Sequence, residues 1–310
     1  MERRYYSFSR YLREKFGRPV YKIPLEAGFN CPNRDGTVSY GGCTFCANES
    51  FSPYAGGGLP IARQIAEVKQ RVRQRHPDAK FFAYFQAYTN TYADPETLRK
   101  LYDPILDDPD IVGLALGTRP DCVPDATLDL IAGYQSALEV WMEYGLQSTH
   151  DATLKRINRG HSAEQFFDAV GRSKERGLKV CAHLILGLPG ETIDHAATTA
   201  RALNEYRVNG VKFHHLQVLK GTALAEEYRA GGLSTLSLKE YVDWVCTLIE
   251  VLDPRIVIQR LVGDTLDSRA LIAPIWNRSK SEILLMIDKE LERRQTYQGR
   301  NIEVALDEVE

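Results

Sequence analysis

The sequence predicts an α/β protein built on a β/α barrel, complete or partial, with an N-terminal arm before it and a C-terminal extension after it. Short, nearly continuous apolar runs, typical of buried parallel strands, alternate with segments whose apolar residues recur at helical spacing. Polar and glycine-rich clusters follow these runs, where the carboxyl ends of barrel strands bring catalytic residues together. A doubly wound open sheet is the alternative arrangement of such units.

The predicted elements follow one another regularly along the chain. Strands are expected at 19–25, 80–86, 111–116, 138–144, 179–186 and 211–219, with a further strand-like run at 255–261. Helices are expected near 61–72, 95–106, 125–134, 162–176, 192–206 and 238–251. Asp94 and Ser162 are predicted N-caps, with Gln165 completing a capping box. We therefore expect an arm over 1–18, a barrel over 19–252 and an extension over 253–310.

Composition points to a globular protein of a reducing compartment. The chain has 310 residues, 44% of them hydrophobic and 26% charged, and a formal charge of −2 that creates no overall field for nucleic acid. Three of its six cysteines crowd into one segment, which does not suit a disulfide framework. No N-terminal apolar run resembles a secretory signal, and no stretch reaches membrane-spanning length. A cytoplasmic protein without a membrane partner is expected.

The N-terminal segment is strongly basic. The first 22 residues carry seven basic side chains against two acidic ones, with aromatic residues among them. Phosphates attract such a segment, and exposed aromatic rings can stack on splayed bases. The alternative is a docked helix whose aromatic side chains pack inward.

A cysteine cluster follows the first predicted strand. Cys43 and Cys46 form a C-x-x-C turn, and eleven residues separate Cys31 from Cys43. Gly41 and Gly42 supply the backbone freedom that such a turn needs. Thiolates in this arrangement select zinc or iron–sulfur clusters. Because no fourth ligand is evident, a four-iron cluster with one open iron is predicted, and a zinc knuckle or unrelated buried thiols are the alternatives.

Four features together resemble one known superfamily. They are the Cys-Thr-Phe-Cys run at 43–46, Gly-Leu-Gln-Ser at 145–148 with its continuation at 154–161, Leu-Gly-Leu-Pro-Gly-Glu at 186–191, and the order of the β/α units. This set resembles the radical S-adenosylmethionine (SAM) enzymes. Their commonest pattern has three residues between the first two cysteines. The spacing of eleven is similar to a subgroup related to the elongator catalytic subunit, most similar to the bacterial YhcC/YtqA-like family.

The resemblance implies the fold, the cofactors and the metal ligands. It implies a TIM-type partial (β/α)6 barrel that holds a 4Fe–4S cluster on Cys31, Cys43 and Cys46. It also implies reductive cleavage of S-adenosyl-L-methionine to a 5′-deoxyadenosyl radical, with electrons from a flavodoxin or ferredoxin. The protein positions such cofactors and excludes water from them.

The resemblance also implies residues that contact SAM. They are Phe45, Thr118, Gln147, Arg159, Gly187, Leu188 and Pro189. The guanidinium of Arg159 suits the carboxylate of SAM, with a surface salt bridge as the alternative. Phe45 is an ordinary core residue in the alternative interpretation, and the glycines at 187 and 190 would then only serve a tight turn. Arg119 and the segment 88–91 are further candidates at strand ends.

Other polar residues on the predicted strands have structural interpretations. Glu143 is either a buried structural carboxylate or a ligand, while His183, His214 and His215 are expected to be hydrogen-bonded barrel residues. The isolated cysteines Cys122, Cys181 and Cys246 are expected to be structural. No catalytic residue is assigned.

The substrate implied by the resemblance is tRNA. The subgroup points to wobble-uridine chemistry, in which a carboxymethylaminomethyl side chain becomes an aminomethyl one. A radical SAM enzyme for a small metabolite or protein is one alternative. A non-catalytic barrel that binds a cluster or zinc is the other.

Overall fold

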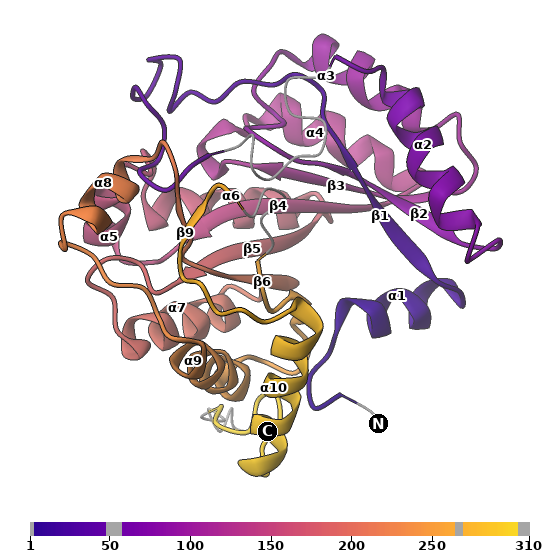
Figure 1. Cartoon of the computed structure of the whole chain (residues 1–310). Helices are drawn as coiled ribbons and strands as arrows, with labels where there is room; N and C mark the ends of the chain where they lie inside the picture. The colour runs from indigo at the N-terminus through magenta and orange to yellow at the C-terminus, as the bar shows by residue number, and fades with distance from the viewer. Residues whose placement is uncertain (1–2, 48–57, 264–268, 303–310) are drawn as a thin grey trace, which may run out of the picture.

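A seven-stranded sheet forms the centre of the computed structural model, which describes residues 3–47, 58–263 and 269–302. All its strands are parallel, in the order β1-β2-β3-β4-β5-β6-β8. They are β1 (Val20–Leu25), β2 (Lys80–Phe85), β3 (Ile111–Thr118), β4 (Glu139–Gln147), β5 (Lys179–Leu186), β6 (Gly210–His215) and β8 (Val257–Arg260). The sheet curls into an open half-barrel whose edges are β1 and β8 (Figure 1), so the predicted partial barrel is confirmed.

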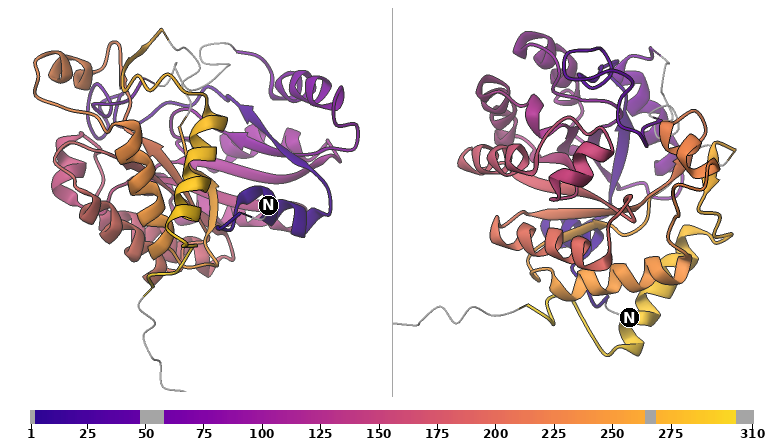
Figure 2. Two further views of the ribbon diagram at one scale, coloured as in Figure 1. Left: turned by 60° about the horizontal axis from the view of Figure 1, so that its bottom comes forward. Right: turned by 90° about the vertical axis from the view of Figure 1, so that its left-hand side faces the viewer.

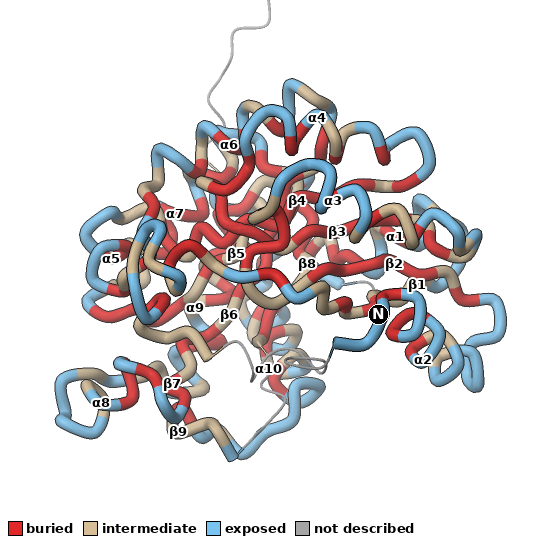
Figure 3. The backbone as a smooth tube through the Cα atoms, turned by 90° about the horizontal axis from the view of Figure 1, so that it is seen from above, coloured by how far each residue is buried: buried red, intermediate tan, exposed pale blue. Residues whose placement is uncertain are grey.

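Helices cover the convex face of this sheet. They are α2 (Ile61–Arg73), α3 (Pro95–Tyr102), α4 (Asp125–Gly133), α6 (Ala163–Glu175), α7 (Ile193–Glu205) and α9 (Leu238–Val251). Their apolar faces and the outward strand residues form one core, in which Leu98, Phe166 and Phe213 are fully buried. Figure 3 shows the strands buried at the centre and the loops exposed at the rim. Both predicted caps are confirmed, because Asp94 accepts two backbone N–H bonds and Ser162 forms its capping box with Gln165.

Two predicted elements differ in the structure. The helix expected over 95–106 leaves α-geometry at Tyr102 and ends in a 3₁₀ turn, Asp103–Ile105, because Pro104 cannot donate a helical hydrogen bond. The strand expected over 211–219 divides into β6 and β7 (Val218–Leu219). β7 pairs antiparallel with β9 (Leu271–Ala273), so these two strands leave the main sheet.

Three further α-helices of the described chain are α5 (Asp151–Arg156), α8 (Ala223–Arg229) and α10 (Lys280–Arg293). The short helices α5 and α8 were not predicted. α8 packs with β7 and β9 over the carboxyl end of the sheet, through an apolar cluster that includes Leu188, Leu216 and Leu224. Near the C-terminus α10 lies beside α9 (Figure 2). None of the helices described is long and apolar enough to cross a bilayer.

The N-terminal helix α1 (Phe8–Phe16) is docked against the open side of the half-barrel. Phe8 and Leu12 pack against Phe82, Trp141 and Val257, which lie early in their strands and face the barrel interior. The Ile258 amide donates to the Tyr6 carbonyl at 2.8 Å, so the chain before α1 runs parallel to β8. Of the two expectations for this segment, the structure therefore shows the docked helix. The expected division at 252 stays a prediction, although β8 beyond it belongs to the main sheet.

Candidate active site

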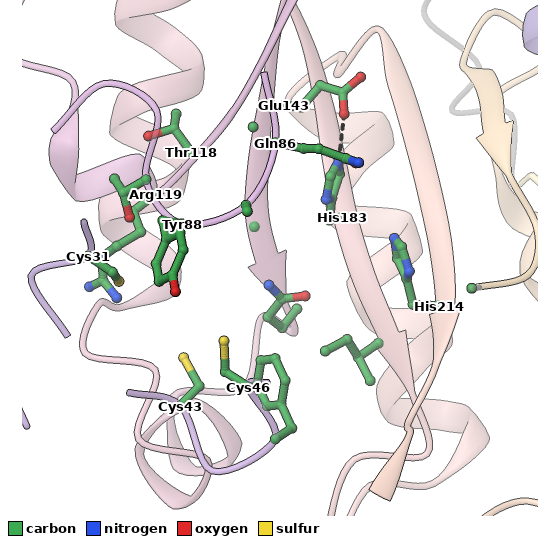
Figure 4. Close-up of a pocket in the computed structure, with 18 of the residues that line it drawn as sticks. Cys31, Cys43, Cys46, Gln86, Tyr88, Thr118, Arg119, Glu143, His183 and His214 are labelled. Carbon is green, nitrogen blue, oxygen red and sulfur yellow. Dashed lines mark hydrogen bonds and ion pairs between the residues drawn. The ribbon is translucent and has the colours of Figure 1, made fainter. Parts of the chain in front are cut away.

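A cavity of about 570 Å³ opens at the carboxyl ends of the strands. Its outer end is lined by the three cysteines of the 31–46 loop, together with Phe45, Thr118, Gln147 and Arg159. It extends into the half-barrel to Tyr84, Glu143, His183, His214 and Arg260. Figure 4 shows the thiols of Cys43 and Cys46 at one end and the Glu143–His183 pair at the other. The structure thus brings most of the predicted site residues to one space.

Local hydrogen bonds fold the cysteine loop around this end. The amides of Arg34 and Cys46 donate to the carbonyls of Cys31 and Cys43 at 2.8 and 2.9 Å. Gly41 and Gly42 both have φ near +80°, which a side chain would disfavour. The Thr44 amide donates to the Ile157 carbonyl at 3.0 Å, and the Thr44 carbonyl accepts from the Leu224 amide at the same distance. The loop is therefore anchored to the end of α5 and the start of α8.

The cysteine environment suits a polynuclear metal group. Cys43 is buried, and its Sγ accepts from Asn33 at 3.5 Å and from Arg159 at 3.7 Å. Burial, and then the charges of Cys43 and Cys31, raise the pKa of the Cys46 thiol to about 12, so its thiolate needs a cationic partner. Among the described residues, no three His, Cys, Asp or Glu side chains are arranged to hold a single metal ion. Soft thiolates that border a cavity of this size fit an iron–sulfur cluster.

Arg159 lies behind the cysteines and is buried. Its Nε and Nη2 donate to the Gly145 carbonyl at 3.1 and 2.7 Å, and the same carbonyl lies 3.0 Å from Nε2 of His161. Within the described part of the chain no carboxylate pairs with it, so the alternative of a surface salt bridge is not observed. A buried guanidinium without a counterion is suited to a carboxylate ligand. Arg119, by contrast, is paired with Asp121 through two hydrogen bonds of 2.9 and 2.7 Å.

Gln147, Thr118 and Phe45 also line the cavity. Gln147 has φ of +72° beside a register shift between β4 and β5, which turns the end of β4. Oγ1 of Thr118 lies 2.6 Å from Oγ1 of Thr91. Phe45 is half-buried against the apolar cluster under α8, so it is both a packing residue and part of the wall.

The segment 187–189 lies beside the cavity. Leu188 is buried in the apolar cluster under α8, and none of the three residues is part of the lining. Gly187 has φ of +83°, and a Cβ there would lie 2.9 Å from Leu236. The tight turn therefore accounts for this glycine, and contact of 187–189 with SAM stays a prediction.

The segment 88–91 splits into two parts. Tyr88 and Thr89 line the cavity, whereas Asn90 donates to the carbonyls of Ala87 and Gly117 at 2.9 and 2.7 Å. Ala87 and Tyr88 have φ of +73° and +58°. Two consecutive non-glycine residues in the left-handed region are costly, and such strain is concentrated at functional sites.

The inner end of the cavity is charged. Glu143 is fully buried and binds Nζ of Lys22 at 2.7 Å, Nε2 of His183 at 3.0 Å and Nζ of Lys212. Burial alone would raise the pKa of Glu143, but the charges of Lys212 and Lys22 hold it well below its usual value. Burial lowers the pKa of Lys212 to about 7. Sequence reasoning missed both lysines, although a lysine inside a predicted buried strand is an available signal.

Residues 30–203 match the family model of the radical SAM superfamily, and residues 208–293 match that of the radical SAM C-terminal domain. The chain belongs to the radical SAM superfamily. It is therefore a radical SAM enzyme, and its cofactors are a 4Fe–4S cluster and S-adenosyl-L-methionine. When bound, these cofactors supply a deoxyadenosyl radical for hydrogen abstraction.

Three similar proteins indicate the subgroup of the superfamily to which this chain is related. YtqA of Bacillus subtilis is 41% identical over 300 residues, which cover 96% of this chain and 93% of YtqA. Protein YhcC of Escherichia coli K12 is 40% identical over 281 residues, 90% of each chain. Elongator complex protein 3 of Saccharomyces cerevisiae is 28% identical over 49% of this chain and 28% of its own.

A solved structure shares the fold of this radical SAM chain. The archaeal Elp3 of Methanocaldococcus infernus superposes with a TM-score of 0.69 at 18% identity, over 91% of this chain and 64% of that chain. The predicted relationship to the YhcC/YtqA-like and elongator-like proteins is confirmed. The roles of the individual site residues stay predictions.

Proposed function

We propose that this radical SAM enzyme remodels a wobble-uridine side chain of tRNA, converting a carboxymethylaminomethyl group into an aminomethyl group. The methylene carbon beside the carboxylate would lose one hydrogen atom to the deoxyadenosyl radical and one electron to the oxidised cluster. Water would then cleave the resulting C–N bond and release the two-carbon fragment as glyoxylate. The observation that carries the proposal is the cavity that runs from the cysteine loop to a charged inner end. Its volume is in the range of small-ligand pockets, so one modified base can reach in while the rest of the tRNA stays outside. The full-length similarity to YtqA and YhcC and the partial similarity to elongator complex protein 3 support the tRNA subgroup.

The residue roles in this proposal follow the geometry. Cys31, Cys43 and Cys46 hold the cluster, and an external donor such as flavodoxin or ferredoxin reduces it. Arg159 binds the carboxylate of SAM through its fork of donors. Gln147, Thr118 and Phe45 form the wall along the adenosine, and 187–189 bring backbone close to it.

The docked N-terminal helix supports radical chemistry in this cavity. Phe8 and Leu12 close the interior at the amino-terminal halves of the strands, below the charged end. A reactive intermediate is protected when water is kept from its site. In this proposal α1 therefore excludes water and does not stack on bases through Phe8.

Modified nucleosides provide the test of the proposal. tRNA from cells that lack the gene should accumulate the carboxymethylaminomethyl form, and the reconstituted, reduced enzyme with SAM should convert that tRNA in vitro. Identical nucleoside profiles with and without the gene, together with no conversion in vitro, would count against tRNA as the substrate. Deoxyadenosine formation in the same samples separates an enzyme with another substrate from a non-catalytic barrel.

A further inference from the structure

Glu143 lies at the inner end of the cavity, and both of its carboxylate oxygens accept hydrogen bonds. Oε1 of Glu143 accepts from Lys22, and Oε2 accepts from Lys212 and lies 3.0 Å from Nε2 of His183. Lys22 also donates to Oε1 of Gln259 at 2.8 Å. Both oxygens of Glu143 are therefore already engaged by side chains of the same interior.

Arg260 adds a positive charge to the same interior. β6 and β8 pair Val211 with Ile258 but Lys212 with Arg260, so β8 contains one extra residue, Gln259. Such a bulge re-aims the side chain that follows it, and Arg260 lines the cavity as a result. Across residues 3–47, 58–263 and 269–302, we find no hydrogen bond or ion pair to its guanidinium.

A count of the charges in this interior leaves it positive. Among the residues that the structure describes, Lys22, Lys212 and Arg260 face a single carboxylate, Glu143. Burial lowers the pKa of His183 to about 4 and that of His214 well below its usual value, so both rings are neutral at pH 7. The neighbouring Tyr84 and Cys181 are neutral as well, because burial raises their pKa values. Within residues 3–47, 58–263 and 269–302, these groups therefore leave one positive charge uncompensated when Lys212 is neutral, and two when it is protonated.

His214 provides a second polar group on the same wall. Its Nε2 is buried and has no hydrogen-bond partner among the described residues. Its ring lies near that of His183, with 5.6 Å between the ring centroids (Figure 4). A buried polar atom without a partner is costly unless a ligand or water satisfies it.

We propose that Arg260 is the binding residue for a carboxylate of the substrate, with the imidazole of His214 as a neighbouring hydrogen-bond donor. The proposal rests on the proposed function, because the carboxymethylaminomethyl group ends in a carboxylate. A guanidinium and a carboxylate pair through two parallel hydrogen bonds, so the contact selects the orientation of the ligand as well as its charge. A carboxylate at the inner end places the rest of the side chain along the cavity, toward the cysteine loop. Arg260 thereby selects the carboxymethylated base over its aminomethyl product.

The first experiment compares turnover of the reconstituted enzyme with tRNA that carries the carboxymethylaminomethyl group. Arg260→Gln should lower kcat/KM by roughly 10- to 100-fold, the loss expected for a charge-assisted contact, and Arg260→Lys should retain an intermediate rate. Arg255→Gln is the matched control, because Arg255 is 82% exposed just before the same strand and pairs with Asp253. Wild-type kcat/KM in Arg260→Gln would overturn the proposal.

The second experiment tests the subsite without relying on tRNA. Saturation-transfer NMR with the SAM-loaded holoenzyme compares N-acetylglycine, its neutral amide N-acetylglycinamide, and inorganic phosphate. The wild type should bind N-acetylglycine in preference to the amide and to phosphate, and Arg260→Gln should lose that preference. Equal binding of carboxylate and amide, or an Arg260-dependent preference for phosphate, would overturn the assignment of a carboxylate.

The two experiments fail in distinguishable ways. If the wild type does not convert tRNA but binds N-acetylglycine through Arg260, the proposed function is wrong and the carboxylate subsite belongs to another substrate. If the wild type converts tRNA and Arg260→Gln does so equally well, the function stands and the subsite is wrong.

Discussion

Cys43 lies deepest of the three thiols in the cysteine loop. It is buried and accepts hydrogen bonds from Asn33 and Arg159, whereas Cys31 and Cys46 are partly exposed. We predict that Cys43→Ala abolishes the cluster, because two thiolates hold four irons poorly. Iron and sulfide analysis after anaerobic reconstitution provides the measurement. Cys246→Ala is the control, since Cys246 lies in α9, away from the cavity. Wild-type iron content in Cys43→Ala would contradict the ligand assignment.

Arg159 contacts both the backbone of β4 and a thiol of the cysteine loop. Two of its nitrogens bind the Gly145 carbonyl, and the third lies beside Cys43. Arg159→Ala should weaken SAM binding by about 1.5–3 kcal/mol through loss of a charge-assisted hydrogen bond. Arg159→Lys should show a smaller loss, because lysine keeps the charge but not the planar fork. Isothermal titration of the cluster-replete protein with SAM measures both affinities. SAM affinity within twofold of wild type in the alanine variant would exclude the contact.

At the scale of elements, the N-terminal segment has two faces. Its apolar side chains pack into the half-barrel, while the side chains of Arg3, Arg4, Arg10 and Arg13 are exposed. The Gln298 amide donates to the Arg4 carbonyl at 2.9 Å, so the chain after α10 lies beside this segment. The two ends of the described chain therefore form one surface, although Arg294 in it is already paired with Asp243 and Glu250.

Replacing those four exposed arginines together by Gln tests this surface as a tRNA contact. We expect weaker tRNA binding and a flatter salt dependence, with roughly one unit of slope lost for each phosphate contact removed. Fluorescence anisotropy from low to moderate salt measures both. Cleavage of SAM without tRNA should survive, because no replaced residue lines the cavity. An unchanged affinity and slope would remove this segment from the tRNA surface, and a wild type that does not bind tRNA at low salt would argue against tRNA itself.

At the scale of the whole molecule, burial of neutral histidines couples folding to pH. Burial lowers the pKa of His183 to about 4, against about 6.5 for an unfolded histidine. Between these pH values the unfolded chain binds the extra proton, so stability falls as the pH falls. From pH 6.5 to 5 His183 should contribute a loss of about 2 kcal/mol to the free energy of unfolding. Urea unfolding of the cluster-free chain measures this loss, and His183→Gln should show a shallower pH dependence. Equal slopes would show that His183 is not kept neutral by the fold.

Local patterns were sufficient for most of the framework. Apolar runs such as 179–186 and caps such as Asp94 depend on neighbours within a few residues, so the strands, helices and loop positions could be predicted from the sequence. The cysteine spacing and the Gly-Leu-Pro-Gly-Glu turn indicated the superfamily for the same reason. Since the carboxyl ends of parallel strands lie at one edge of a sheet, the sequence also predicted that the cysteine loop and the glycine-rich turns lie close together.

Tertiary structure decided which faces meet. The apolar face of α1 could have been covered by a partner, and only packing against Phe82 and Trp141 places it inside the half-barrel. The run 211–219 divides because its end pairs with β9, a segment fifty residues away that no local pattern indicates. Lys22, Lys212 and Arg260 converge near Glu143 through the register of four different strands and one bulge in β8. Periodicity predicts that a side chain points inward. Which side chains it meets there depends on the register between strands, and that register is set by the packing of the whole sheet.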